Sequence, residues 1–201
     1  MTTKTEIANL SISHLGIGQT IQNLDTETSQ EAKVARRFYD FARRTTLVAI
    51  NWPFATEFQA LGLIEEEPTN EWNYSYRYPS QCLKIRRILS GVRSDTLSSL
   101  VPYRIVKDDT FKLIYTDQEE AEAEITKDVE TTSFFSPDYT LALSYLLATY
   151  IAPSVTRGDP TKMRDKVYAL YLEEISRAKS NAFNEEVIEQ YGDSDLIRAR
   201  S

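Results

Sequence analysis

The 201-residue chain has very few of the residues on which most catalytic and metal sites depend. It contains one cysteine, Cys82, and one histidine, His14. One cysteine cannot form a disulfide within the chain, and one histidine with one cysteine cannot complete a zinc site. His14 directly precedes Leu15 and Gly16, a pair typical of a helix end, so we expect it to cap terminal carbonyl groups rather than to act as a base.

Long apolar runs and an excess of positive charge are also absent. The longest apolar run, residues 141–152, is interrupted by Ser144 and Thr149, and it is shorter than the roughly 20 residues of a membrane-spanning helix. The first residues form no apolar targeting segment, so we expect synthesis in a reducing cytoplasm. The net charge of −7 counts against general affinity for nucleic-acid phosphates.

The glycine and acidic motifs do not form any recognisable cofactor or metal site. Residues 16–18 read Gly-Ile-Gly, but a third glycine is missing and a helix precedes them where a nucleotide-binding loop needs a strand. Residues 117–120 lack the central glycine of a calcium loop. No pair among the 30 acidic residues stands out for glycoside hydrolysis. We therefore predict no catalytic residue, no metal site and no cofactor.

What the chain does contain is enough apolar sequence for an ordered core, with 41% hydrophobic and 11% aromatic residues. Helical spacing and capping residues, among them a capping-box pattern at 28–31 and Ser136-Pro137-Asp138, predict four helices. These helices cover about residues 7–15, 32–49, 137–152 and 160–182.

The middle of the chain changes to the period of two that is typical of strands. Alternation at 74–78, near-alternation at 83–88, a hairpin pattern over 103–115 and a further candidate at 121–125 indicate antiparallel pairing. The predicted fold class is therefore α+β, mainly α: a four-helix core with a small antiparallel β-region inserted in it.

We divide the chain accordingly into three parts. Residues 1–71 and 131–183 form the helical core, residues 72–130 the β-rich insertion, and residues 184–201 an extended C-terminal docking tail. The tail has either no role, as a frayed terminus, or orders against a partner through its branched apolar residues. The candidate partner-binding residues of this tail are Val187, Ile188, Tyr191, Leu196, Ile197, Arg198 and Arg200.

Charge and aromatic residues indicate protein interfaces elsewhere in the chain. A basic stretch at 33–44 and an acidic stretch at 117–130 suit neighbours that meet head to tail, although solvated helix faces would look the same. Aromatic residues and arginines of the β-region are types that anchor interfaces, whereas we expect most aromatics of residues 38–58 to lie in the core. The candidate interface residues are Arg36, Arg37, Arg43, Trp72, Tyr74, Tyr76, Arg77, Arg86, Arg87, Glu119, Glu120 and Glu122.

Five segments in order carry a family resemblance. They are Leu-Gly-Ile-Gly at 15–18, Ala-Arg-Arg-Phe-Tyr-Asp at 35–40, Asn-Trp-Pro-Phe at 51–54, the tyrosine-rich stretch 72–88 and Phe-Ser-Pro-Asp at 135–138. Together they resemble the head-to-tail adaptors of short-tailed bacteriophages, also called tail tubular protein A or tail accessory factor. The resemblance covers about residues 6–182.

The resemblance implies a structural virion protein rather than an enzyme. Such a protein has a helical core with a β-insertion and forms a ring of about twelve copies between the portal protein and the tail nozzle. The ring extends the channel through which genomic DNA passes without specific binding, and the C-terminal segment docks on the portal. The protein would be made in the host bacterial cytoplasm and reside at the head–tail junction of the virion, away from membranes. A tail-associated cell-wall hydrolase and a cytoplasmic interaction module remain the alternatives.

Overall fold

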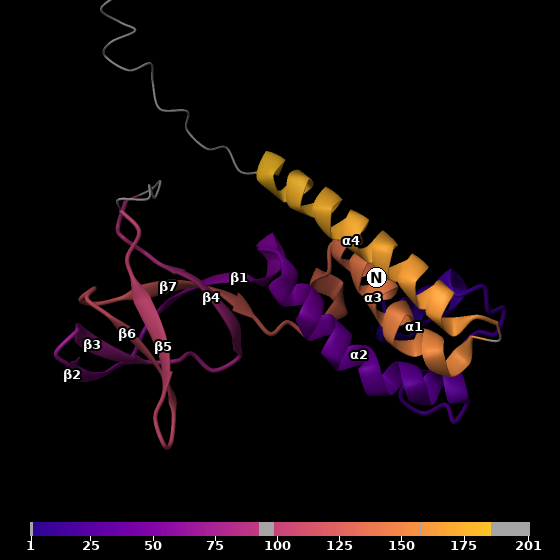
Figure 1. Cartoon of the computed structure of the whole chain (residues 1–201), viewed down its shortest axis with the longest axis horizontal. Coiled ribbons are helices and arrows are strands. Elements are labelled where there is room, and N and C mark those ends of the chain that lie inside the picture. The colour runs from indigo at the N-terminus through magenta and orange to yellow at the C-terminus, as the bar shows by residue number, and fades with distance from the viewer. Residues whose placement is uncertain (1, 93–98, 157, 186–201) are drawn as a thin grey trace, which may run out of the picture.

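The computed structural model describes residues 2–92, 99–156 and 158–185, which contain four α-helices and seven strands (Figure 1). The helices are α1 (Lys4–His14), α2 (Gln30–Ala49), α3 (Pro137–Val155) and α4 (Pro160–Glu185). The strands are β1 (Thr56–Ala60), β2 (Leu63–Thr69), β3 (Trp72–Arg77), β4 (Cys82–Ile88), β5 (Tyr103–Lys107), β6 (Lys112–Thr116) and β7 (Glu122–Lys127). The α1–α4 assembly is called the helical module below, and residues 56–127 are called the β module.

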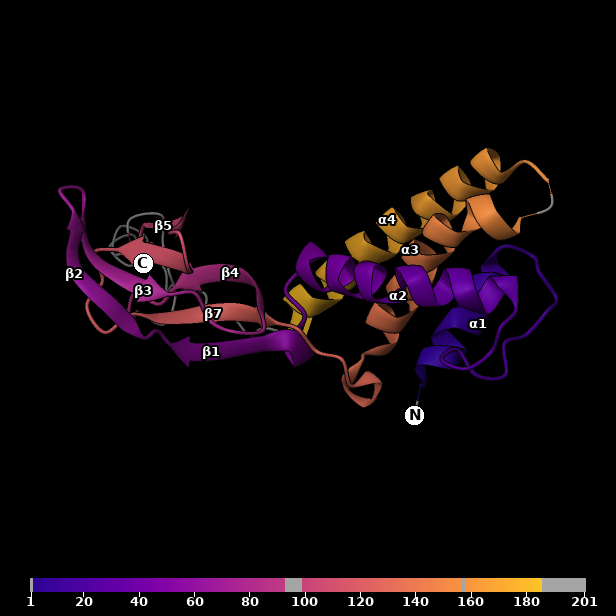
Figure 2. The same ribbon diagram turned by 90° about the horizontal axis from the view of Figure 1, so that it is seen from below.

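The expected helix-dominated fold is wrong, because the chain is an α+β protein with substantial sheet. Two antiparallel sheets form a β module that lies beside the helices and extends well beyond them (Figure 2). Sheet structure begins at Thr56 rather than at residue 72, since β1 and β2 were both missed. In β2, three consecutive glutamates and Pro68 disfavour a strand, and they are tolerated because β2 lies at a sheet edge.

The four predicted helices are confirmed, with differences at their ends. Ser29 rather than Thr28 caps α2, and its hydroxyl accepts from the amide of Ala32. Gly16 adopts a φ of 72° just beyond α1, as expected for a left-handed helix end. His14 does not cap carbonyl groups. Instead its Nε2 lies 3.0 Å from Oγ of Ser144, so it joins α1 to α3.

Helix α3 is the centre of the helical module. Its residues are apolar on nearly every side, as is typical of a buried helix. Helices α1, α2 and α4 all pack against it (Figure 1). Leu143, Leu147 and Ile151 have no exposed surface. Tyr139 lies in the first turn of the same helix, and its ring meets that of Trp52 edge to face at a centroid distance of 5.1 Å. These contacts form one continuous core from chain segments that precede and follow the β module in the sequence.

The β module has its own core between its two sheets. The strand orders are β1-β7-β4 and β2-β3-β6-β5, and every pairing is antiparallel. Strands β5 and β6 form the predicted hairpin. Tyr76 and Ile114 of one sheet and Ile85 and Ile125 of the other are buried in a common cluster. The β module is therefore a second packed unit, joined to the helices by the segments before β1 and after β7.

Candidate interaction surface

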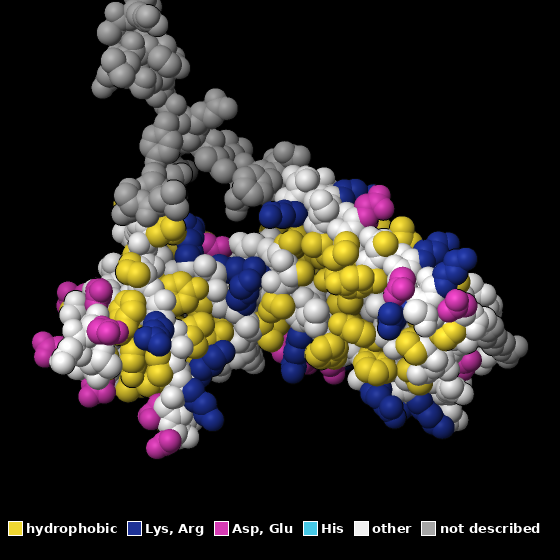
Figure 3. Space-filling model, viewed as in Figure 1, with side chains coloured by type: hydrophobic (Ala, Val, Ile, Leu, Met, Phe, Trp, Pro, Cys, Tyr) yellow, Lys and Arg dark blue, Asp and Glu magenta, His cyan; other side chains and the backbone are white. Residues whose placement is uncertain are grey.

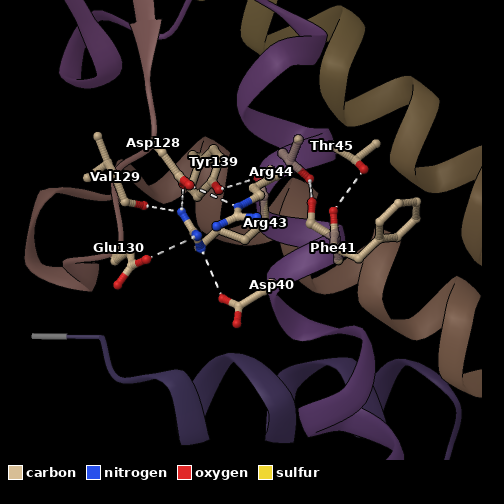
Figure 4. Close-up of polar contacts among 11 residues, drawn as sticks. Asp40, Phe41, Arg43, Arg44, Thr45, Asp128, Val129, Glu130 and Tyr139 are labelled. Atoms are coloured by element: carbon tan, nitrogen blue, oxygen red, sulfur yellow. Dashed lines mark hydrogen bonds and ion pairs between the residues drawn. The ribbon is translucent and has the colours of Figure 1, made fainter. Parts of the chain in front are cut away.

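Arg43, a predicted interface residue, is fully buried inside the protomer (Figure 4). Its Nη1 donates to the carboxylate of Asp128 and, at 2.7 Å, to the carbonyl of Val129, while Nε reaches Asp40 at 3.3 Å. Burial alone would lower the pKa of Arg43, but the hydrogen bond and charge of Asp128 raise it overall. The interface prediction for Arg43 is wrong, because this arginine joins α2 to the segment that follows β7.

Arg86 holds the other crossing between the modules, while the neighbouring Arg87 pairs within the β module. Nη2 of Arg86 donates to carbonyl groups in and just after the last turn of α2, including those of Leu47 and Ile50, and burial lowers the pKa of Arg86. Nε of Arg87 lies 2.6 Å from a carboxylate oxygen of Glu124. Both side chains are only partly exposed and make contacts within the protomer.

The aromatic residues of β3 also differ from the prediction. Trp72, Tyr74 and Tyr76 alternate along the strand, and Tyr74 and Tyr76 pack in the cluster between the two sheets. Tyr76 is buried, and its hydroxyl donates to the carbonyl of Gln118 at 2.9 Å, while Trp72 and Tyr74 are half-buried. The interface prediction for Tyr76 is therefore wrong, because this side chain belongs to the core of the β module. Arg77 is exposed, and its guanidinium lies 4.3 Å from the ring centre of Phe111.

The remaining predicted interface residues are exposed. Arg36 uses its guanidinium to hold the carbonyls of Leu24 and Glu27, each at 2.8 Å, so it stabilises the loop before α2. Arg37 has no ion-pair or hydrogen-bond partner within the described ranges. Three acidic residues just before and at the start of β7 are likewise at the surface, namely Glu119, Glu120 and Glu122. The predicted tail residues Val187, Ile188, Tyr191, Leu196, Ile197, Arg198 and Arg200 lie outside the described residues.

An apolar face on the helical module was not predicted. Phe41 of α2 is 59% exposed, and Tyr168 and Leu172 of α4 are 45% and 50% exposed. Tyr150 of α3 is half-buried, with its ring centre 5.3 Å from that of Phe41. Figure 3 shows hydrophobic side chains gathered between α2 and α4. We call Phe41, Tyr150, Tyr168 and Leu172 the helical apolar face, a kind of surface that commonly marks a protein contact.

Basic side chains of α2 border this face. Lys33, Arg37 and Arg44 lie on the same side of the helix as Phe41, because they are spaced from it by multiples of three and four residues. Lys33 and Arg37 are exposed without ion-pair partners among the described residues, whereas Arg44 contacts Asp128 at 2.9 Å. The helical apolar face thus has a basic border.

A second surface lies at the end of the β module farthest from the helices. Strand β2 is the edge of its sheet and is exposed on both sides, with Leu63 and Ile64 at 49% and 50% exposure. Glu65, Glu66 and Glu67 follow them directly. We call residues 63–67 the acidic β edge. Figure 3 shows acidic side chains collected at this end of the molecule.

Further acidic residues lie near the acidic β edge. The backbone amide of Asn73 on β3 donates to the carboxylate of Asp117 at 3.0 Å, which joins the β2–β3 hairpin to the acidic segment before β7. The β2–β3 hairpin and the segment before β7 thus contribute to one acidic region.

Within the described ranges, no group of three histidine, cysteine or acidic side chains is arranged to hold a metal ion. None of the helices described is long and apolar enough to cross a bilayer.

Comparison with protein families finds no matching family, and no curated protein is significantly similar to the chain. The two modules therefore carry two unlike surfaces. The helical apolar face has a basic border, and the acidic β edge combines Leu63 and Ile64 with three glutamates.

Proposed function

We propose that the protein is a structural virion component, the head-to-tail adaptor of a short-tailed bacteriophage. Copies of it form a ring of about twelve subunits between the portal protein and the tail nozzle, and the ring extends the channel for the genome. The family resemblance of residues 6–182 is the first support for this proposal.

The observation that carries the proposal furthest is the pair of unlike surfaces on one elongated protomer (Figures 1 and 3). A ring is built from heterologous contacts, in which one surface of each subunit binds a different surface of the next. The helical apolar face, which has a basic border, and the acidic β edge differ in both secondary structure and charge, as such contacts require. They also lie on different modules, so that two neighbours can be engaged at once.

The charge of the protein also suits a wall around passing DNA. A net charge of −7 and exposed acids such as Glu119, Glu120 and Glu122 repel phosphates weakly. Genomic DNA would therefore slide through the ring without being held.

The test is mass photometry of the purified protein with the portal ring encoded by the same genome. We expect portal particles to gain a fixed mass that corresponds to a ring of subunits, and to gain none with an unrelated acidic protein of similar size. Deletion of residues 186–201 then tests whether the tail docks on the portal. Failure of the intact protein to bind the portal at low and moderate salt would refute the adaptor proposal, and clearing of purified cell walls would favour a hydrolase instead.

A further inference from the structure

We propose that the helical apolar face of one copy binds the acidic β edge of a second copy. This inference rests on the proposed ring, because it names the two surfaces that would meet between neighbouring subunits. The exposure, the charges and the separation of the two surfaces support it.

The helical apolar face brings apolar side chains of α2, α3 and α4 together at the surface. Phe41 and Tyr150 are in ring contact, and Tyr168 and Leu172 lie one helical turn apart on α4. Helices α3 and α4 pack along each other, and Figure 3 shows hydrophobic side chains gathered between α2 and α4. Three helices thus contribute aromatic and aliphatic atoms to one exposed surface, as in the centre of a protein interface.

The acidic β edge has the features of the matching partner. Leu63 and Ile64 are half-exposed on a strand with one unpaired edge, so their apolar surface is open to another chain. Glu65, Glu66 and Glu67 would repel the same strand of another copy, which protects the edge from pairing with itself. A surface that joins an apolar centre to positive charge is therefore the favoured partner.

The basic border of the helical apolar face supplies that charge. Lys33 and Arg37 are exposed, and neither has an ion-pair partner among the described residues. If Leu63 and Ile64 pack against the helical apolar face, the glutamates of β2 come close to Lys33 and Arg37. Charge complementarity of this kind selects the partner and its orientation.

The two surfaces cannot meet within one protomer. They belong to different modules, and Figure 2 shows β2 at the far end of the β module from the helices. Arg43 and Arg86 hold both chain crossings between the modules through partly buried hydrogen bonds. The contact must therefore form between copies. Because it joins unlike surfaces, it propagates from subunit to subunit and closes into a ring when the rotation allows.

The experiment compares two charge-reversal variants of the full chain, separately and mixed, for ring formation on the portal by mass photometry. One variant carries Lys33→Glu with Arg37→Glu, and the other carries Glu65→Lys with Glu66→Lys. Arg36 is left unchanged because it holds the loop before α2. A control with Lys84→Glu and Arg104→Glu makes the same charge change as the first variant at exposed positions of β4 and β5.

We expect each variant alone to assemble about tenfold more weakly than the native protein, because like charges then face each other at every contact. An equal mixture should recover assembly, since an alternating ring places opposite charges at each contact. The control should assemble normally. Phe41→Ser should weaken assembly without unfolding the exposed site it occupies, and circular dichroism checks that all the variants are folded.

The outcomes separate this inference from the proposed function. Normal rings from both charge variants would overturn the pairing of surfaces and leave the adaptor role standing. If the native protein does not bind the portal, the adaptor role fails, and sedimentation velocity at increasing concentration tests the pairing on the same variants. Self-association that the reversals weaken and the mixture restores would support the pairing, while its absence in the native protein would overturn it.

Discussion

Replacing Arg43 with methionine tests whether a buried ion pair holds the two modules together. Methionine keeps an unbranched stem of similar length and removes the guanidinium. Asp128, which is nearly buried, would lose its bond to Nη1, and the carbonyl of Val129 would lose a donor at 2.7 Å. The change therefore leaves two acceptors without their partner at the point where the chain returns to the helices.

The expected loss follows from the environment of this pair. Removing one member of a buried ion pair costs about 3–5 kcal/mol, because the other charge stays in a poorly solvated site. Arg44 still contacts Asp128 at 2.9 Å and continues to neutralise part of its charge. We therefore expect a loss at the lower end of this range, about 3 kcal/mol. Arg44→Met is the matched control. The side chain of Arg44 is 54% exposed, so losing its contact with the same carboxylate should cost only about 0–1 kcal/mol.

Urea unfolding followed by circular dichroism gives the free energy of unfolding for each variant. Trp52 lies in the helical core and Trp72 on β3, so single-tryptophan versions report on each module separately by fluorescence. We expect Arg43→Met to separate the two transitions and Arg44→Met to leave them coincident. Equal losses in the two variants, or a loss under about 1 kcal/mol for Arg43→Met, would refute the reasoning about burial.

Three further predictions concern single contacts. Arg86→Met should lower the free energy of unfolding by about 2 kcal/mol, because several carbonyls at the end of α2 lose their donor. It should also speed amide hydrogen exchange in the last turn of α2, and unchanged exchange there would contradict this. Burial lowers the pKa of His14 below 6.5, so the unfolded chain binds the proton first, and stability should fall as the pH drops below 6.5. His14→Gln should flatten that dependence in thermal melts across pH 5–8, and an unchanged slope would assign it to other groups. Gly16→Ala should lower stability by about 1 kcal/mol because of its positive φ, whereas Gly18→Ala should be close to neutral, and equal effects in denaturant unfolding would refute the strain argument.

The helices were predictable from sequence because their signals are local. Ser136 and Pro137 define the start of α3 within two residues, and Asp159 lies immediately before α4, where its carboxylate accepts from two backbone amides. The hairpin of β5 and β6 was predictable for the same reason. Each of these elements is specified by residues that are close together in the chain.

The direction of the aromatic side chains was not predictable in this way. Alternation places Trp72, Tyr74 and Tyr76 on one face of β3, but the covering sheet contains β4 and β7, which follow later in the chain. Conversely, Phe41 and Phe58 were expected in the core and are more than half exposed. Periodicity identifies a face, whereas only the tertiary arrangement determines which face is buried.

The burial of Arg43 depends on a still more distant contact. Its main partner, Asp128, follows 85 residues later, and no spacing rule connects a residue of α2 with the segment after β7. The basic stretch 33–44 therefore divides into a buried junction residue, a loop anchor and exposed side chains. Its net positive charge in the sequence conceals three separate roles.

The insertion of the β module between α2 and α3 also determines the order in which the nascent chain can fold. Residues 56–127 leave the ribosome as a complete unit, whereas α1 and α2 must wait for α3, which supplies most of the surface that buries them. His14 meets its partner Ser144 only after 130 further residues have been made. During synthesis the β module can thus fold first, while the apolar faces of α1 and α2 remain open to chaperones until α3 closes the helical core.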